Sequence, residues 1–292
     1  MKMTVSIVTD SVSDIPKDIA EKLGITVVPL NLHFGTTTYL DNIDLTADEF
    51  YERLPDANPL PTTSQPSAGA FADTYRSVLE NTSEILSLHA SSKLSGTYNS
   101  AVLGREELLQ ELENNGNNNP LHTIEVIDTQ WVSMAQGLLV IAAAEAAQDG
   151  MNLNDLKSLV NDLSSRTHIT AVVDTLEYLA RGGRLGKAGA FLGSILSLKP
   201  ILKIEDGEVQ PAGRVRSTAK ARQQLRENVI NAAPVERLAL AYSTTRDVAN
   251  EMAAELQQHV VSGEVILYQI GPVVGTHAGP GLIATAWIDT KG

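Results

Sequence analysis

Short apolar runs alternate with amphipathic segments through the first half of the chain. The runs VSIVTD, TVVPLNLHF, EILSL and TIEVID have the length of buried strands, and the segments between them repeat their apolar positions at helical spacing. Caps support the helices: Pro16 and Gly24 bracket the first, TADE at 46–49 matches a capping box, and an apolar helix ends at Gly150. This alternation predicts a mostly parallel sheet with flanking helices, which binds ligands at the carboxyl ends of its strands.

From about Thr167 the pattern changes. ITAVVDT, VERLALAYS and GEVILYQIG read as strands, with a helix from about Arg246 to Val260, and Asp206-Gly207 is a hairpin signal between two further strands. AFLGSIL reads as a small apolar helix, and a glycine-rich turn around His277 leads into a final strand. We therefore expect an α/β protein with two domains, residues 1–166 with a mostly parallel sheet and residues 167–292 with a mixed sheet and helices.

Two hydroxyl-rich segments of the first half are candidates for binding an anion. SSKLSGTYNSA joins a strand to a long helix, so the free N-H groups of Ser95, Gly96 and Thr97 would favour a carboxylate or phosphate. PTTSQPS presents Thr62 and Thr63 on a loop stiffened by proline. Each segment has a simpler interpretation as a helix cap or a turn, which the sequence alone leaves open.

Composition removes several classes of function. The 292 residues carry a formal charge of -13 and no cysteine, which argues against nonspecific nucleic-acid binding and excludes disulfides and thiol chemistry. No apolar run is long enough to cross a membrane, and the first residues do not resemble a signal peptide, so we expect a cytoplasmic protein without membrane insertion. GxGxxG and GxxxxGK[ST] loops and HExxH are absent, so we predict neither a nucleotide cofactor nor a metal site.

A hydrolase remains an alternative from the residues alone. Ser95, His277 and Asp10 are the types that form a catalytic triad, although Ser95 lies in KLSGT rather than in a GxSxG turn. A serine and a histidine occur together in most chains by chance, so this pairing needs geometric support before it carries weight.

Six motifs in order resemble those of the DegV family. They are VTDS at 8–11, TTSQPS at 62–67, SSKLSGTYNSA at 91–101, LEYLARGGRLG at 176–186, GRVRS at 213–217 and THAGPG at 276–281, and the resemblance spans about residues 3–290. It implies a two-domain α/β protein that binds a long-chain fatty acid between its domains. For some bacterial members it also implies service as the carrier subunit of fatty acid kinase, whose separate ATP-binding subunit phosphorylates the bound carboxyl group.

The resemblance assigns roles to particular residues. Thr63, Ser95, the Gly96 amide and His277 would bind the carboxylate, with Thr62 and Ser92 as additional head-group contacts, whereas no residue would be catalytic. Arg181 and one of Arg214 or Arg216 would dock the kinase. The helices AFLGSILSL and GLLVIAAAEAA are candidates to line the tail's tunnel, although ordinary core is the favoured interpretation for any single residue of them. A lipid sensor or storage protein without a kinase shares the same site, and a serine-dependent acyl hydrolase is the third hypothesis.

Overall fold

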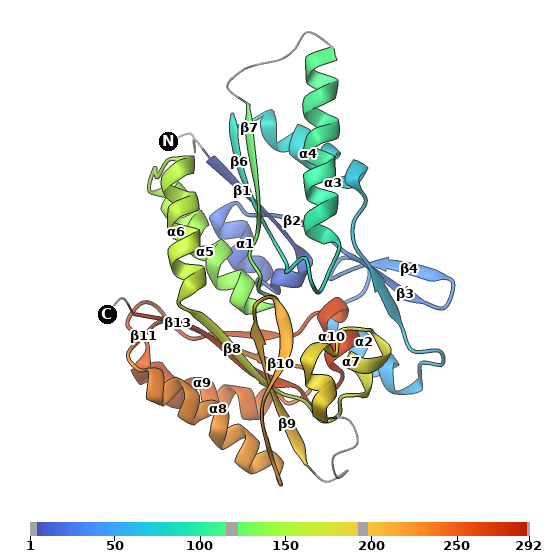
Figure 1. The fold of residues 1–292 in the computed structure, drawn as a ribbon, viewed down its shortest axis with the longest axis vertical. Coiled ribbons are helices and arrows are strands. Elements are labelled where there is room, and N and C mark those ends of the chain that lie inside the picture. Colours follow the sequence, from blue (N-terminus) through green and yellow to red (C-terminus); the bar gives the residue numbers. More distant parts are fainter. Residues whose placement is uncertain (1–4, 115–121, 192–197, 291–292) are drawn as a thin grey trace.

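A computed structural model describes residues 5–114, 122–191 and 198–290 (Figure 1). In the first half, four parallel strands form a sheet in the order β2-β1-β6-β7. Ile7 and Leu86 pack with α5 on one face, whereas Val8 and Ile85 pack with α3 and α4 on the other, as the alternation of a buried strand requires. The bounds are β1 Val5–Asp10, β2 Thr26–Val28, β6 Glu84–His89, β7 Thr123–Asp128, α1 Lys17–Leu23, α3 Ala68–Leu79, α4 Thr97–Asn114, α5 Met134–Gln148 and α6 Leu153–Ser165.

The second half forms a six-stranded mixed sheet in the order β10-β9-β8-β13-β11-β12. Only β11 and β12 pair in parallel within it. Helices α8 and α9 cover one face, and part of the opposite face packs on α5 of the first half (Figure 1). The bounds are β8 Thr167–Val172, β9 Lys199–Glu205, β10 Glu208–Val215, β11 Val235–Tyr242, β12 Ile266–Gln269, β13 Ile283–Asp289, α8 Thr218–Ala232 and α9 Arg246–Leu256.

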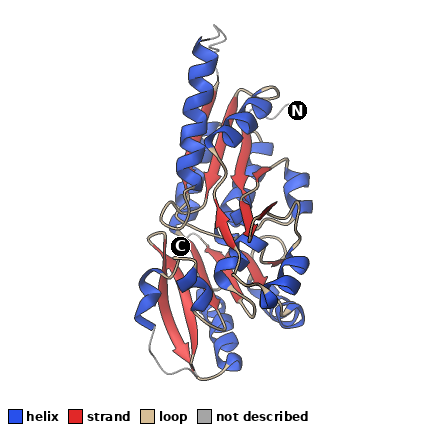
Figure 2. Cartoon of the chain, turned by 90° about the vertical axis from the view of Figure 1, so that its right-hand side faces the viewer, coloured by secondary structure: helices blue, strands red, loops and turns tan. Residues whose placement is uncertain are grey.

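The expected α/β architecture, with one parallel and one mixed sheet, is confirmed. We propose that the two domains meet between residues 166 and 167, because β7 is the last strand of the parallel sheet along the chain and β8 is the first strand of the mixed sheet. Figure 2 shows the two sheets one above the other along the long axis of the molecule. Among the described residues, no helix has both the length and the apolarity that a membrane crossing needs.

A third, antiparallel sheet of three short strands, β4-β3-β5, packs beside α2 and α10. Its strands are β3 Asn31–Phe34, β4 Thr37–Leu40 and β5 Thr62–Ser64, and the helices are α2 Ala47–Arg53 and α10 Pro272–Ala278. The remaining short helices are α7 Glu177–Arg181, η1 Ser11–Ser13, η2 Leu54–Asp56, η3 Gly186–Phe191 and η4 Gln257–His259. Through α10, the C-terminal half reaches into the N-terminal half (Figure 1).

Three local expectations were wrong. Residues 26–34 form two strands in different sheets instead of one, since Pro29 and Leu30 interrupt the run. Thr62–Ser64 form β5 rather than a loop, because β3 offers them a free edge. The segment around His277 is helix α10 rather than a turn, and Pro272 begins it. The edge of β3 decided the conformation of Thr62–Ser64, whereas a local residue, Pro29, divides the run 26–34.

Local capping signals were reliable by comparison. Thr46 and Glu49 form the expected capping box, and Gly24 ends α1 in the left-handed conformation. Asp206 and Gly207 both have positive φ angles, as a tight two-residue hairpin requires. The expected helix AFLGSIL lies largely outside the described residues, as does the asparagine-rich break after α4.

Gly104 permits the close packing of α3 on α4, and it yields the first prediction. A Cβ at this position would lie 2.5 Å from the Ala68 carbonyl oxygen and 2.6 Å from the Phe71 Cβ, so Gly104→Ala must push the helices apart. We expect a loss of about 1–3 kcal/mol in the free energy of unfolding, measured by denaturant titration, despite the better helix propensity of alanine. Gly69→Ala is the matched control in α3, because its Cβ would meet only Ser67 Oγ at 3.9 Å. A Gly104→Ala variant as stable as Gly69→Ala would contradict the packing argument.

Candidate functional site

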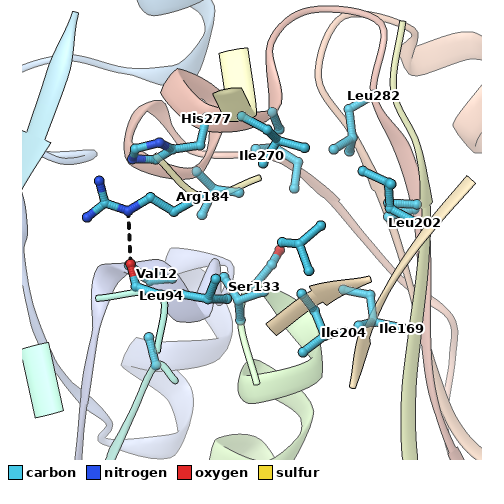
Figure 3. Close-up of a pocket in the computed structure, with 18 of the residues that line it drawn as sticks. Val12, Leu94, Ser133, Ile169, Arg184, Leu202, Ile204, Ile270, His277 and Leu282 are labelled. Carbon is cyan, nitrogen blue, oxygen red and sulfur yellow. Dashed lines mark hydrogen bonds between the residues drawn. The ribbon is translucent and has the colours of Figure 1, made fainter. Parts of the chain in front are cut away.

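An apolar pocket of about 140 Å³ lies between the parallel sheet and the six-stranded sheet (Figure 3). The turns after β1, β6 and β7 supply one wall through Val12, Ala90 and Val132. Strands β8, β9 and β13 supply the opposite wall, and α10 closes one side. The pocket lies outside the carboxyl ends of the parallel strands, which is where ligands of such sheets bind. Among the residues of the opposite wall are Ile169, Leu202, Ile204, Leu282 and Ala284.

Three of the residues implied for a carboxylate site, Thr63, Ser95 and His277, line this pocket. Thr63 Oγ1 lies 2.9 Å from His277 Nε2, which joins β5 to α10 across 214 residues of sequence. Burial, assisted by the charge of Arg184, lowers the pKa of His277 to about 4, so the imidazole is neutral near pH 7. Its Nδ1 is buried without a hydrogen-bond partner. The neutral ring therefore holds Thr63 through Nε2, while its Nδ1 lies against Gly182.

Ser95 combines a capping role with a position on the pocket wall. Its Oγ accepts a hydrogen bond from the Thr97 amide at 3.3 Å and lies 2.8 Å from Thr97 Oγ1, so it caps the start of α4. Gly96 lies beside it, outside the lining residues, and packs on the Gln65 side chain, where a Cβ would come within 2.9 Å of Nε2. The two interpretations of this segment, helix cap and ligand contact, are thus compatible.

Arg184 is a lining residue that the sequence argument did not place in the pocket. Its Nε donates to the Leu94 carbonyl at 3.0 Å (Figure 3). Its Nη1 donates to the Gly182 carbonyl at 2.6 Å. These contacts bring a guanidinium beside His277 and hold the turn that carries Ser95. The signal in the sequence was the RGGR motif, whose two arginines could not be told apart without the fold.

The other predicted residues lie outside the pocket lining. Thr62 is exposed on β5, and the exposed Ser92 donates its amide to Asp128. Arg181 is also exposed and pairs with Glu177 at 2.7 Å along α7. Arg214 and Arg216 are exposed at the end of β10, where the guanidinium of Arg214 lies over the Phe191 ring.

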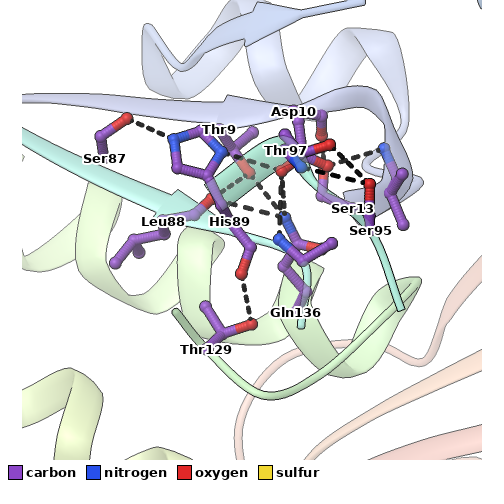
Figure 4. Close-up of polar contacts among 12 residues, drawn as sticks. Thr9, Asp10, Ser13, Ser87, Leu88, His89, Ser95, Thr97, Thr129 and Gln136 are labelled. Atoms are coloured by element: carbon purple, nitrogen blue, oxygen red, sulfur yellow. Dashed lines mark hydrogen bonds and ion pairs between the residues drawn. The ribbon is translucent and has the colours of Figure 1, made fainter. Parts of the chain in front are cut away.

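The candidate catalytic triad of Ser95, His277 and Asp10 is not formed, because Asp10 hydrogen-bonds to a different histidine. Asp10 Oδ2 lies 2.8 Å from His89 Nδ1, and His89 Nε2 lies 2.7 Å from Ser87 Oγ (Figure 4). This order resembles a hydrolase relay, yet all three side chains are fully buried, so no substrate reaches Ser87. Asp10 also accepts the amides of Val12 and Ala90, so the relay fixes two turns that line the pocket.

For the apolar helix GLLVIAAAEAA, the lining favours ordinary core over the tunnel wall. This part of α5 contributes no lining residue and is ordinary core between the two sheets. The second candidate helix, AFLGSILSL, lies largely outside the described residues. Within the described ranges, no group of three histidine, aspartate or glutamate side chains is placed to hold a metal ion.

The fold and the pocket define a class: an α/β protein whose two main sheets enclose an apolar pocket with a small polar cluster at one end. A family model described as an uncharacterised protein of the DegV family matches residues 4–290, and the chain belongs to this family. A DegV domain-containing protein of Caldanaerobacter subterraneus is 34% identical over an alignment of 279 residues, which covers 94% of this chain and 95% of the relative.

Solved structures agree with this assignment. A DegV family protein from Thermus thermophilus, described by its fatty acid binding, has a TM-score of 0.88 and 35% identity, covering 99% of this chain and 100% of that one. A stearic acid-binding protein from Eubacterium ventriosum has a TM-score of 0.84 and 29% identity, covering 98% of both chains. The predicted family is therefore confirmed.

Gly182 yields a prediction about the polar cluster. A Cβ at this position would lie 2.1 Å from His277 Nδ1, so Gly182→Ala must displace the imidazole from Thr63. We expect a lower free energy of unfolding, by about 1–3 kcal/mol, together with a changed imidazole ¹⁵N resonance for His277. Gly189→Ala is the control, since its Cβ would come no closer than 3.6 Å to Leu185. An unchanged His277 resonance in Gly182→Ala would show that the ring does not depend on this space.

Proposed function

We propose that this protein binds one long-chain fatty acid in the pocket, with the carboxylate at Thr63, Ser95, the Gly96 amide and His277. Thr62 and Ser92 lie just outside and would act on the head group only if it shifts towards solvent. The observation that carries the proposal is the mostly apolar lining of the pocket, in which Thr63, Ser95 and His277 lie together with Arg184. Ser133 and Lys203 are the other polar residues of the described lining. An amphiphile with a polar head and a long apolar tail matches such a cavity. The fatty acids named for the related structures support this ligand class.

Tail and head contribute differently to the proposed binding. Burying about fifteen methylenes at about 0.8 kcal/mol each gives an upper bound of roughly 12 kcal/mol, before the cost of ordering the chain. The head group then fixes orientation more than affinity. A threonine, a serine and a neutral imidazole offer hydrogen bonds without an ion pair, and the Arg184 guanidinium nearby offsets the negative charge.

We further propose that the protein presents the carboxylate to a separate ATP-dependent kinase subunit, in the bacterial cytoplasm, and is not itself catalytic. Two features support this role. The sequence has no nucleotide-binding glycine loop, and Asp10, the acid of the candidate triad, binds His89 instead of His277. The exposed Arg181, Arg214 and Arg216 would form the docking face on an otherwise acidic chain. A lipid sensor or storage protein would use the same pocket without this partner.

The ligand is tested by organic-solvent extraction of the purified protein and mass spectrometry. We expect a long-chain fatty acid in near-stoichiometric amount, or its uptake on later incubation. Ser95→Ala and His277→Ala should each weaken fatty-acid binding by about 1–3 kcal/mol, because a buried carboxylate loses a hydrogen-bond donor. Ser158→Ala, on the exposed side of α6, is the control. A protein that neither carries nor takes up a fatty acid would overturn the proposal.

Kinase docking is tested in a reconstituted acyl-phosphate assay at limiting carrier concentration. Arg181→Ala and the Arg214→Ala/Arg216→Ala double variant should lower the rate about tenfold or more while fatty-acid affinity stays unchanged, since exposed interface charges act on association. Arg246→Ala, exposed at the start of α9, should retain the full rate. If all these variants support wild-type phosphorylation, the arginines are ordinary surface residues.

A further inference from the structure

Two buried carboxyl groups of the N-terminal half bind the first turn of α10. Asp14 Oδ1 accepts the Gly271 amide at 3.0 Å, and Asp41 Oδ1 accepts the Val273 amide at 3.2 Å. Asp14 is 7% exposed and Asp41 is 2% exposed, so both groups lie within the molecule. Neither carboxyl belongs to the pocket lining, but the helix they hold brings Val273 and His277 to the pocket.

Helix α10 is connected to the rest of the chain in a way that makes these contacts important. Gly271 precedes it, and Gly279, at a φ of +74°, ends it. Its last turn is held by the bond between His277 and Thr63, and its first turn by Asp14 and Asp41. Releasing the first turn would therefore move both an apolar wall of the pocket and the imidazole of the head-group cluster.

The surroundings of the two carboxyls disfavour their ionised forms. Ser133 Oγ donates to Asp14 Oδ2 at 2.6 Å and lies 2.7 Å from the Tyr268 hydroxyl; this bond by itself lowers the pKa of Asp14, but the effect of burial is larger. The charged or titratable groups that act on the pair are Asp10 of β1, Tyr51 of α2 and Tyr268 of β12, none of them a cation. Burial, reinforced by neighbouring carboxylates, raises the pKa of Asp14 to about 8 and that of Asp41 to about 7.

We infer that Asp14 and Asp41 are positioning residues for α10, and that their ionisation shortens the time for which the pocket holds its ligand. This inference rests on the proposed binding of a fatty acid. Opening α10 exposes the carboxyls to water, where they ionise at their ordinary acidic pKa, so opening releases protons. Raising the pH therefore favours the open form, by up to about tenfold per pH unit and per carboxyl, until the pH passes the folded pKa of that group.

Between pH 6 and pH 9, Asp14 and Asp41 can be titrated without a change in the charge of His277, Tyr51 or Tyr268. His277 is already neutral there, because its pKa is lowered to about 4. Burial raises the pKa of Tyr51 and of Tyr268 well above 10, so both phenols stay protonated. A change of ligand retention that depends on Asp14 and Asp41 can thus be separated from the titration of the head-group site.

The experiment measures the rate at which the loaded full-length protein transfers radiolabelled palmitate to excess phosphatidylcholine vesicles from pH 6 to pH 9. We expect release to accelerate at least about tenfold across this range. Asp14→Asn and Asp41→Asn should each reduce the rise, and the double variant should abolish it, because asparagine cannot ionise. Asp56→Asn, at an exposed carboxyl, should keep the wild-type profile. Release that is independent of pH in the wild type, or equally dependent in the double variant, would overturn the inference.

A second measurement needs neither variants nor ligand. The amide resonances of Gly271 and Val273 should titrate with midpoints near pH 8 and pH 7, because each amide donates to a carboxyl that ionises there. Flat amide shifts from pH 5 to pH 9 would refute the role of the carboxyls even if the variants fail to fold. Failure of palmitate uptake, with both amides titrating as expected, would instead refute the proposed fatty-acid binding alone.

Discussion

The structure depends on the hydrogen bonds that tie α10, a helix of the C-terminal half, to the N-terminal half. Asp14 and Asp41 bind the start of this helix, and Thr63 binds its last turn through His277. An apolar cavity between two sheets tends to collapse or to open, because no attractive interaction between its apolar walls fixes the distance between them. Short polar contacts at the two ends of one helix keep the space at a fixed width and leave its walls apolar.

These hydrogen bonds are stable because burial keeps His277, Asp14 and Asp41 largely uncharged. A charged imidazole or an unpaired carboxylate buried between α10 and the N-terminal half would raise the free energy of the folded state by far more than one hydrogen bond lowers it. Burial therefore lowers the pKa of His277 and raises those of Asp14 and Asp41. The Arg184 guanidinium lies beside His277 in the pocket lining, where it would offset the charge of the proposed ionised head group.

Three glycines on or beside α10 make room for neighbouring side chains. A Cβ at Gly182 would overlap the His277 ring, one at Gly275 would lie 2.5 Å from the Tyr51 hydroxyl, and one at Gly279 would lie 2.3 Å from the Tyr178 ring. Each glycine makes space for a side chain from a different segment. Their role is to let α10 approach its neighbours closely, and the polar cluster depends on that approach.

The sequence by itself determined what depends on local pattern, such as the capping box at Thr46 and the hairpin at Asp206, since neighbouring residues supply the necessary interactions. The alternation of apolar runs and helices also predicted the parallel sheet, although its pairing is long-range and joins Val5 of β1 to Glu84 of β6. The sequence also identified Thr63, Ser95 and His277 as a group, through motifs rather than through spacing. Only the tertiary structure decided that Thr63 lies on a strand, that His277 lies on a helix, and that Arg184 rather than Arg181 faces the pocket. Asp14 and Asp41 gave no signal, because a buried carboxyl and an exposed one look alike until long-range packing removes water from one of them.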